Sequence, residues 1–79
     1  MNKKTVLVTG SSIGLGASII RKFASNNYNV IINYNTNEEK AEQLANELSN
    51  KYHTDYLLVK QEKYIDVKNA LIGAECEFI

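Results

Sequence analysis

The feature that most constrains this chain is a short apolar segment that runs directly into a cluster of glycines. Val6–Val8 precede the residues Thr9-Gly10-Ser11-Ser12-Ile13-Gly14-Leu15-Gly16, after which apolar residues recur at helical spacing. This order predicts a buried strand, a tight turn and the first turn of a helix. At a helix start, unpaired N–H groups and the positive end of the helix dipole favour an anion. The segment therefore predicts a phosphate-binding turn.

The length and composition of the chain predict one small domain, residues 1–79. Lys plus Arg balances Asp plus Glu at nine each, so no net field attracts nucleic acid or an anionic membrane, and we expect neither as a partner. Cys76 is the only cysteine, which excludes an internal disulfide and fits the reducing cytoplasm. The apolar stretch near the amino terminus is too short for a signal peptide or a membrane span.

The first half of the chain predicts a strand, a helix and a second strand. Thr5–Thr9 is the first strand, expected to be internal in its sheet because β-branched residues dominate it. A helix follows from about Gly14 to near Asn26, and Asn27 is expected in the left-handed conformation that ends many helices. An apolar row along this helix comprises Leu15, Ile19 and Phe23, with Ile20 and Ala24 beside it.

The second half repeats the pattern. Val30–Tyr34 is the second strand, and the Thr36-x-x-Glu39 spacing predicts a capping box at the start of the next helix. That helix is expected to bury Ala41, Leu44, Ala45 and Leu48, and a third strand is expected at Tyr56–Val59. A weaker helical pattern places Val67, Leu71, Ala74 and Phe78 on one side.

The order of these elements is strand, helix, strand, helix, strand, helix. Right-handed crossovers place three parallel strands in the order 3-2-1. We therefore predict an α/β architecture that is half of a doubly wound nucleotide-binding fold.

Two stretches resemble the short-chain dehydrogenase/reductase family. The residues from Thr9 to Gly16 match its Thr-Gly-x-x-x-Gly-x-Gly fingerprint. The run from Val30 to Leu48, with Asn-Tyr at the end of its strand and Asn-Glu-Glu-Lys-Ala-Glu after it, looks most like the 3-oxoacyl-[acyl-carrier-protein] reductase branch. The resemblance covers about residues 4–60 and implies half of a Rossmann fold that binds a dinucleotide.

The resemblance also implies which residues bind the dinucleotide. Those around its adenosine phosphates and ribose would be Gly10, Ser11, Ser12, Ile13, Gly14 and Gly16. Structural interpretations stand beside this one. Gly16 is expected to let the helix pack closely on the strand, and Ser11 and Ser12 have the chemistry of helix caps.

The choice of cofactor depends on Tyr34 and Asn35, at the end of the second strand. An acidic residue there would hydrogen-bond the adenosine ribose and repel a 2′-phosphate. Both residues are neutral, which favours NADP and leaves NAD as an alternative. Ile13 stands where phosphate-selecting relatives often carry Arg, so the discrimination is expected to be weak.

The resemblance weakens after Val59. The family pattern has an Asp there that binds the adenine, whereas this chain has Lys60. We expect the chain to end at Ile79 before a fourth strand, and before the family's catalytic Ser and Tyr-x-x-x-Lys. It is then the cofactor-binding part of a reductase, inactive alone. The alternatives are a non-catalytic dinucleotide-binding or interaction module, and a decayed gene remnant.

Two Tyr-x-x-x-Lys strings do not fit catalysis. Tyr56 and Lys60 lie on a predicted strand, about 13 Å apart at strand spacing. Tyr64 and Lys68 have no suitable serine before them, so we expect a solvated tyrosine and a surface lysine. We also expect no metal site, because the lone His53 lies in a polar loop, and we interpret Cys76 as a packing or surface thiol.

A sheet that stops at three strands leaves the first strand open on one side. Val6, Leu7 and Val8 would then present an unpaired apolar edge. We therefore predict self-association or a partner chain through the exposed first strand.

Overall fold

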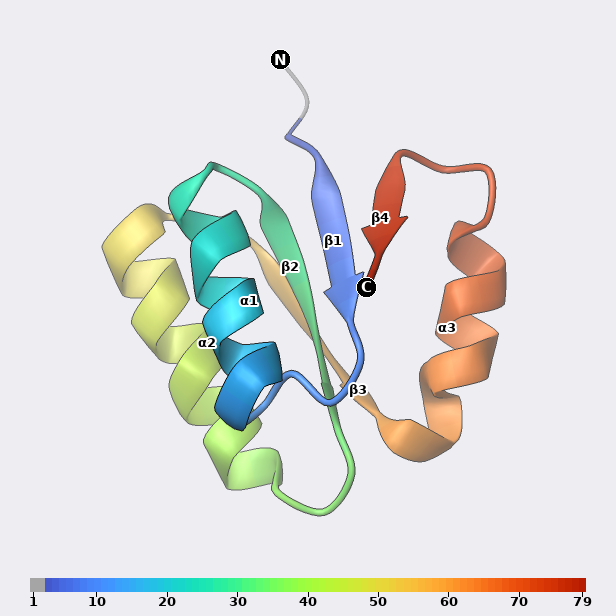
Figure 1. Cartoon of the computed structure of the whole chain (residues 1–79), viewed down its shortest axis with the longest axis horizontal. Helices are drawn as coiled ribbons and strands as arrows, with labels where there is room; N and C mark the ends of the chain where they lie inside the picture. The colour runs from blue at the N-terminus through green and yellow to red at the C-terminus, as the bar shows by residue number, and fades with distance from the viewer. Residues whose placement is uncertain (1–2) are drawn as a thin grey trace.

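A computed structural model describes residues 3–79 as a four-stranded parallel sheet with helices on both faces (Figure 1). The elements are β1 (Thr5–Val8), α1 (Gly14–Ser25), β2 (Asn29–Tyr34), α2 (Glu38–Tyr52), β3 (Tyr56–Lys60), a 3₁₀ turn η1 (Gln61–Lys63), α3 (Tyr64–Leu71) and β4 (Cys76–Phe78). The sheet order is β3-β2-β1-β4. The predicted α/β architecture and the internal position of β1 are confirmed.

The prediction of only three strands was wrong. β4 pairs in parallel with β1, with Thr5 opposite Cys76 and Leu7 opposite Phe78. The N–H of Ile79 donates to the carbonyl of Leu7 at 2.9 Å, and the carbonyl of Ile79 accepts from the N–H of Thr9 at 3.0 Å. The last residues therefore cover the edge that was expected to be open, and the exposed first strand does not exist.

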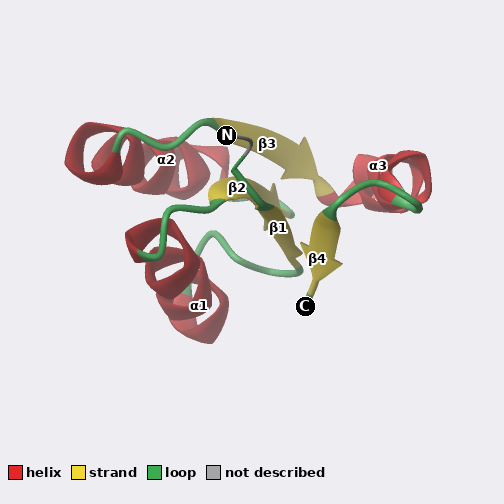
Figure 2. Cartoon of the chain, turned by 90° about the horizontal axis from the view of Figure 1, so that it is seen from above, coloured by secondary structure: helices red, strands yellow, loops and turns green. Residues whose placement is uncertain are grey.

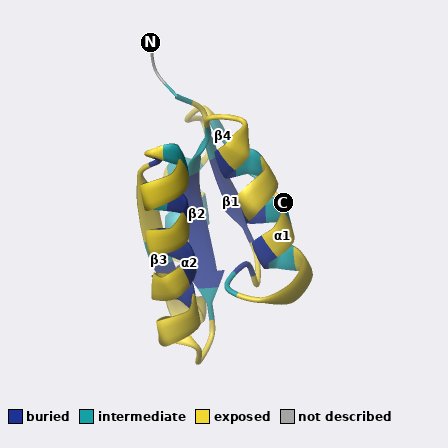
Figure 3. Cartoon of the chain, turned by 90° about the vertical axis from the view of Figure 1, so that its left-hand side faces the viewer, coloured by how far each residue is buried: buried dark blue, intermediate teal, exposed yellow. Residues whose placement is uncertain are grey.

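One face of the sheet is covered by α1 and α2, which lie side by side (Figure 2). Side chains from β1 and β2, among them Val6 and Ile32, pack against the inner sides of both helices, where Ile20 and Leu48 are fully buried. Figure 3 shows that the buried parts of α1 and α2 face the sheet and that their exposed parts face outward. The buried stripe of α2 is the predicted one, comprising Ala41, Leu44, Ala45 and Leu48.

The ends of these helices agree in part with the sequence. Asn27 has φ 69°, so the left-handed residue after α1 is confirmed. The capping box is wrong, because α2 begins at Glu38 and its N-cap is Asn37 instead of Thr36. The backbone carbonyl of Asn37 accepts the first helical bond from Ala41 at 3.2 Å.

The other face of the sheet carries α3 alone (Figure 2). This helix ends at Leu71, and Gly73 follows with φ 92°, so the chain turns back before Phe78. The predicted continuous helix over Ala74 and Phe78 was therefore wrong. Phe78 reaches the same apolar cluster as Leu71 from β4. Within residues 3–79, no helix is long and apolar enough to cross a bilayer.

Candidate functional site

A hollow of about 290 Å³ lies at the carboxyl end of the sheet, where the turn after β1 meets the segment after β2. Parallel α/β sheets commonly bind ligands at this end. The residues that line it are Gly10, Ser12, Ile13, Asn33, Tyr34, Asn35, Thr36, Asn37 and Gln61. The structure thus brings together five of the predicted site residues, Gly10, Ser12, Ile13, Tyr34 and Asn35, and places Ser11, Gly14 and Gly16 behind or beside the lining.

The turn after β1 presents free backbone amides beside this hollow. Gly14 begins α1 with φ 59°, a left-handed conformation that costs a residue with a side chain about 1–2 kcal/mol. The N-cap is the apolar Ile13, which has no polar side-chain atom to satisfy the helix start. The amides of residues 12–16 donate to no acceptor within residues 3–79. Five donors at the positive end of a helix therefore remain for an anion.

Gly16 permits the helix to approach the turn closely. A Cβ built on Gly16 would overlap the carbonyl oxygen of Gly10 and lie 2.7 Å from the Cα of Ser11. Backbone atoms fill that space and cannot swing aside as a side chain can. The packing interpretation of Gly16 is confirmed, and it explains why α1 starts so close to β1.

Ser11 faces into the protein and not into the hollow. Its side chain is fully buried, and its Oγ accepts the N–H of Asn33 at 2.9 Å. The N–H of Ser11 donates to the carbonyl of Asn33 at 3.0 Å. The capping interpretation of Ser11 and Ser12 was wrong, because the N-cap of α1 is Ile13. Ser11 instead joins the turn to β2.

Asn33 is the site residue that sequence reasoning missed. It lies among the apolar residues of β2, is 1% exposed, and lines the hollow. Its side-chain Oδ1 accepts the N–H of Gly10 at 2.8 Å, and its Nδ2 donates to the carbonyl of Val59 at 3.2 Å. The available signal was a single amide in an otherwise apolar strand, since a buried polar group requires partners. Three further lining residues were also missed, Thr36, Asn37 and Gln61.

Tyr34, the last residue of β2, and Asn35, which follows it, line one side of the hollow. Partial burial and the nearby carboxylates of Glu38, Glu42 and Glu62 raise the pKa of the Tyr34 phenol. The phenol therefore stays neutral and able to donate a hydrogen bond at neutral pH. All of the described residues that line the hollow are uncharged.

Neither Tyr-x-x-x-Lys string forms a candidate catalytic pair. Tyr56 and Lys60 lie on β3 as predicted. Tyr64 was expected to be solvated, but it is only 8% exposed and packs in the apolar cluster under α3. The Nζ of Lys68 lies 6.0 Å from the centroid of its ring. Tyr64 therefore serves the core of the second face.

The lone histidine and cysteine occupy ordinary structural positions. His53 is exposed and ends α2 with φ 55°. Cys76 is half-buried on β4, and burial raises the pKa of its thiol, which agrees with a packing thiol of low reactivity. No group of three or more His, Cys, Asp or Glu residues in the described part of the chain is placed to hold a metal ion.

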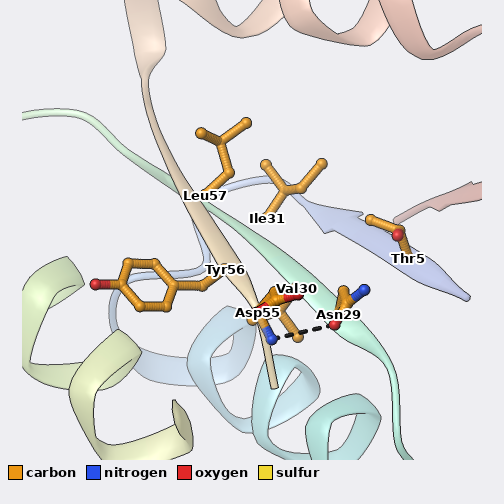
Figure 4. Close-up of a pocket in the computed structure, with 7 residues that line it drawn as sticks. All are labelled: Thr5, Asn29, Val30, Ile31, Asp55, Tyr56 and Leu57. Carbon is orange, nitrogen blue, oxygen red and sulfur yellow. Dashed lines mark hydrogen bonds between the residues drawn. The ribbon is translucent and has the colours of Figure 1, made fainter. Parts of the chain in front are cut away.

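A second hollow, of about 210 Å³, lies at the opposite end of the sheet (Figure 4). It contains none of the predicted site residues. Its lining comes from the first residues of three strands and the loop before β3, namely Thr5, Asn29, Val30, Ile31, Asp55, Tyr56 and Leu57. In Figure 4 the side chain of Asn29 turns to the backbone of Asp55, so its polar group serves the loop.

Comparison with known proteins identifies the family. The sequence model of the short chain dehydrogenase family matches residues 4–77. The chain belongs to the short-chain dehydrogenase family. It is 48% identical over 46 residues to an uncharacterized oxidoreductase of Bacillus subtilis, and 46% identical over 48 residues to a 3-oxoacyl-[acyl-carrier-protein] reductase of Staphylococcus aureus. These matches cover 58% and 61% of this chain, but 19% and 20% of those relatives.

Two solved structures share the fold. A short chain dehydrogenase from Burkholderia cenocepacia, in complex with NADP, has a TM-score of 0.73 and 26% identity, covering 90% of this chain and 29% of that one. An acetoin dehydrogenase from Salmonella typhimurium has a TM-score of 0.76 over 91% of this chain and 33% of its own, at 18% identity, which shows the fold alone. The chain thus spans about a fifth to a third of the length of these relatives and solved structures.

Proposed function

We propose that this short-chain dehydrogenase chain binds NADP(H), with NAD(H) as the second candidate, in the hollow at the carboxyl end of its sheet. The observation that carries the proposal is the set of free amides at residues 12–16 beside that hollow. Hydrogen bonds to a charged partner contribute about 1.5–3 kcal/mol each, so backbone donors alone suffice to hold a diphosphate. The family and its NADP-bound member support a dinucleotide as the ligand.

Different residues around the hollow bind different parts of the dinucleotide. The amides of Ser12, Ile13 and Gly14 face the diphosphate. Tyr34 and Asn35 flank the adenosine ribose, and Gln61, which also lines the hollow, lies beside the adenine. Ser11 supports this arrangement from behind through its hydrogen bonds to Asn33, and Gly16 lets α1 begin close to the turn.

The selection between the two dinucleotides rests on two opposing observations. The lining is uncharged, so no side chain in it repels the 2′-phosphate of NADP. Yet the carboxylates of Glu38, Glu42 and Glu62 act on Tyr34, and their negative potential opposes that phosphate and favours NAD(H). We expect a preference of less than about tenfold, because screening weakens exposed charges.

The activity that this site serves in the complete enzyme is the reduction of a carbonyl group to an alcohol, or the reverse oxidation of the alcohol. The resemblance to a 3-oxoacyl-[acyl-carrier-protein] reductase supports a 3-oxoacyl or related carbonyl substrate for the complete enzyme. We assign this chain cofactor binding and no proton transfer, because Tyr64 is buried and Tyr56 lies on a strand. A dinucleotide-binding module without catalysis is the alternative.

We also propose that the chain self-associates, but through an edge strand of the sheet other than β1. β1 is paired on both sides, so the edges of the described sheet are β3 and β4. Ile79, which continues β4, is 48% exposed, and an unpaired strand edge can pair with another chain. Size-exclusion chromatography should show a dimer or larger species. We place the chain in the cytoplasm, in keeping with its unpaired Cys76 thiol.

The test of binding is calorimetric titration of the chain with NADPH and with NADH. Gly14→Ala should reduce the affinity at least tenfold, because it disturbs the left-handed start of α1. Gly73→Ala is the matched control, since Gly73 also has a positive φ but lies before β4, at the other end of the sheet. No heat with either dinucleotide, or equal losses in both variants, would contradict the proposal.

A further inference from the structure

We infer that Asn33 is the positioning residue of the nucleotide site: its side chain holds the glycine turn in its ligand-binding conformation and ties it to the end of β3. The inference rests on the proposed function and adds to it a residue outside the glycine fingerprint. Asn33 itself lies at the floor of the hollow, between the turn and the third strand.

Asn33 holds the turn through three hydrogen bonds. Its Oδ1 accepts from the N–H of Gly10 at 2.8 Å. Its backbone N–H donates to the Oγ of Ser11 at 2.9 Å, and its carbonyl accepts the N–H of Ser11 at 3.0 Å. The amides of the turn therefore form two groups. Those of Gly10 and Ser11 donate to Asn33 on β2, and those of residues 12–16 remain free for the ligand.

The fourth hydrogen bond of Asn33 reaches the neighbouring strand. Its Nδ2 donates to the carbonyl of Val59 at 3.2 Å, near the end of β3. Gln61, which lines the hollow, follows two residues later. One amide group therefore fixes the phosphate side of the hollow relative to its adenine side, because it bonds to both.

The amide is specific for this role because its two ends differ. Oδ1 meets only a donor and Nδ2 meets only an acceptor. The side chain is buried, and no buried side-chain polar atom within residues 3–79 lacks a partner. An apolar residue of similar size would leave the N–H of Gly10 without its partner and would remove the side-chain link to the carbonyl of Val59, so the turn would be free to rotate its inward amides.

Asn29 provides a matched control on the same strand. It begins β2, at the end opposite the hollow, and is half-buried. Its Oδ1 accepts from the N–H of Asp55 at 3.1 Å and from the hydroxyl of Thr54 at 3.5 Å, as the dashed contact in Figure 4 illustrates for Asp55. Asn29 thus joins a loop to β2 with an amide, but touches neither the glycine turn nor the hollow.

The first test compares Asn33→Leu with Asn29→Leu by calorimetric titration with NADPH and NADH and by thermal unfolding. Both variants should unfold at lower temperature than the wild type. Affinity, corrected for the folded fraction, should fall at least tenfold in Asn33→Leu and less than twofold in Asn29→Leu. Equal affinity losses in the two variants would reduce Asn33 to a structural residue and overturn the inference.

The second test uses pH to restore the missing hydrogen bond. In Asn33→Asp, the ionised carboxylate accepts from Gly10 but cannot donate to Val59, whereas the neutral acid does both, as the amide does. The affinity of Asn33→Asp relative to wild type should therefore recover at least threefold between pH 8 and pH 5.5, and Asn29→Asp should show no such recovery. A flat ratio for Asn33→Asp contradicts the inference.

The third test needs no variant and separates the inference from the proposed function. In the nuclear magnetic resonance spectra of the wild type, the amide of Gly10 should show a scalar coupling through its hydrogen bond to the side-chain carbonyl of Asn33. Its exchange with solvent should be slower than that of Ser12. If the wild type binds no dinucleotide, the proposed function fails, and absence of this coupling overturns the positioning role independently.

Discussion

The two faces of the sheet differ in how much apolar surface they bury. The first face carries α1 with 12 residues and α2 with 15, and its cluster includes fully buried Ile20, Ile32 and Leu48. The second face carries α3 with only 8 residues, over a cluster of four buried residues, and Ile65 of that helix is 60% exposed. Stability is therefore expected to reside mainly on the first face.

The candidate site is built from both faces of the sheet, so the difference in their packing also affects the site. The glycine turn leads into α1 and belongs to the first face, whereas Gln61 leads into α3 and belongs to the second. The phosphate side of the hollow is thus built on the better-packed part of the molecule, and the adenine side on the weaker part. Local opening should affect the adenine side first.

The largest expected effect is that of truncating the core of the first face. Leu48→Ala should lower the free energy of unfolding by about 3 kcal/mol, because it leaves a cavity where a leucine is fully buried. Urea denaturation measures the loss. Leu15→Ala, at a leucine that is 78% exposed on α1, should change stability by less than about 0.5 kcal/mol. Similar losses of stability in both variants would mean that the buried core of the first face does not dominate the stability of the protein.

The contact between the first helix and the glycine turn gives the next effect. Gly16→Ala should cost about 2 kcal/mol, because its new Cβ meets the backbone of Gly10 and Ser11. Gly73→Ala, at an open position before β4, should cost about 1 kcal/mol through its positive φ alone. If Gly73→Ala proved the more harmful in chemical denaturation, the close approach of α1 would not matter for stability.

The first face was also the part of the fold that the sequence predicted best. β1 and β2 are apolar runs rich in β-branched residues, which indicate buried strands. α2 has strong helical periodicity that indicates its buried side, as Leu44 and Leu48 show. The buried side of α1 was predicted only in part. Ile20 and Ala24 are buried as predicted, but Leu15, which heads the predicted row, is exposed, and Ala17, which was not predicted, is buried.

The second face could not be predicted in the same way. The spacing of Val67, Leu71 and Phe78 resembles one helix, although the chain turns at Gly73 and Phe78 reaches the cluster from a strand. Only three residues form β4, and their pairing depends on β1, which is distant in the sequence. At the site, the glycine fingerprint indicated the turn, whereas the role of Asn33 depends on contacts between three strands.

A smaller effect is expected when the second face is truncated. Leu71→Ala should cost about 1 kcal/mol, because the side chain is only partly buried. Hydrogen exchange should show the amides of α3 opening at lower free energy than those of β2, and Leu71→Ala should widen that gap. Ile65→Ala, at an exposed position of the same helix, is the control and should leave both rates unchanged. Equal protection of the amides of α3 and β2 from hydrogen exchange would contradict the expected difference in stability between the two faces.

The smallest effect concerns the ion pair that joins the two helices of the first face. The guanidinium of Arg21 on α1 donates to the carboxylate of Glu47 on α2 at 2.9 and 3.2 Å, and both side chains are nearly half exposed. The hydrogen bond from Arg21 lowers the pKa of Glu47. An exposed pair of this kind contributes at most about 0.5 kcal/mol after solvent screening.

The sign of its pH dependence follows from that lowered pKa. A carboxyl whose pKa is lower in the folded state stabilises the fold above the pKa of the unfolded chain, and this stabilisation is lost as pH falls through the folded pKa. Arg21→Gln should therefore lower the free energy of unfolding by about 0.3 kcal/mol at pH 7 and by progressively less in acid. Lys22→Gln removes the same charge from a residue with no ion pair within residues 3–79 and should show no such convergence. Parallel pH profiles for wild type and Arg21→Gln would mean that packing alone holds α1 to α2.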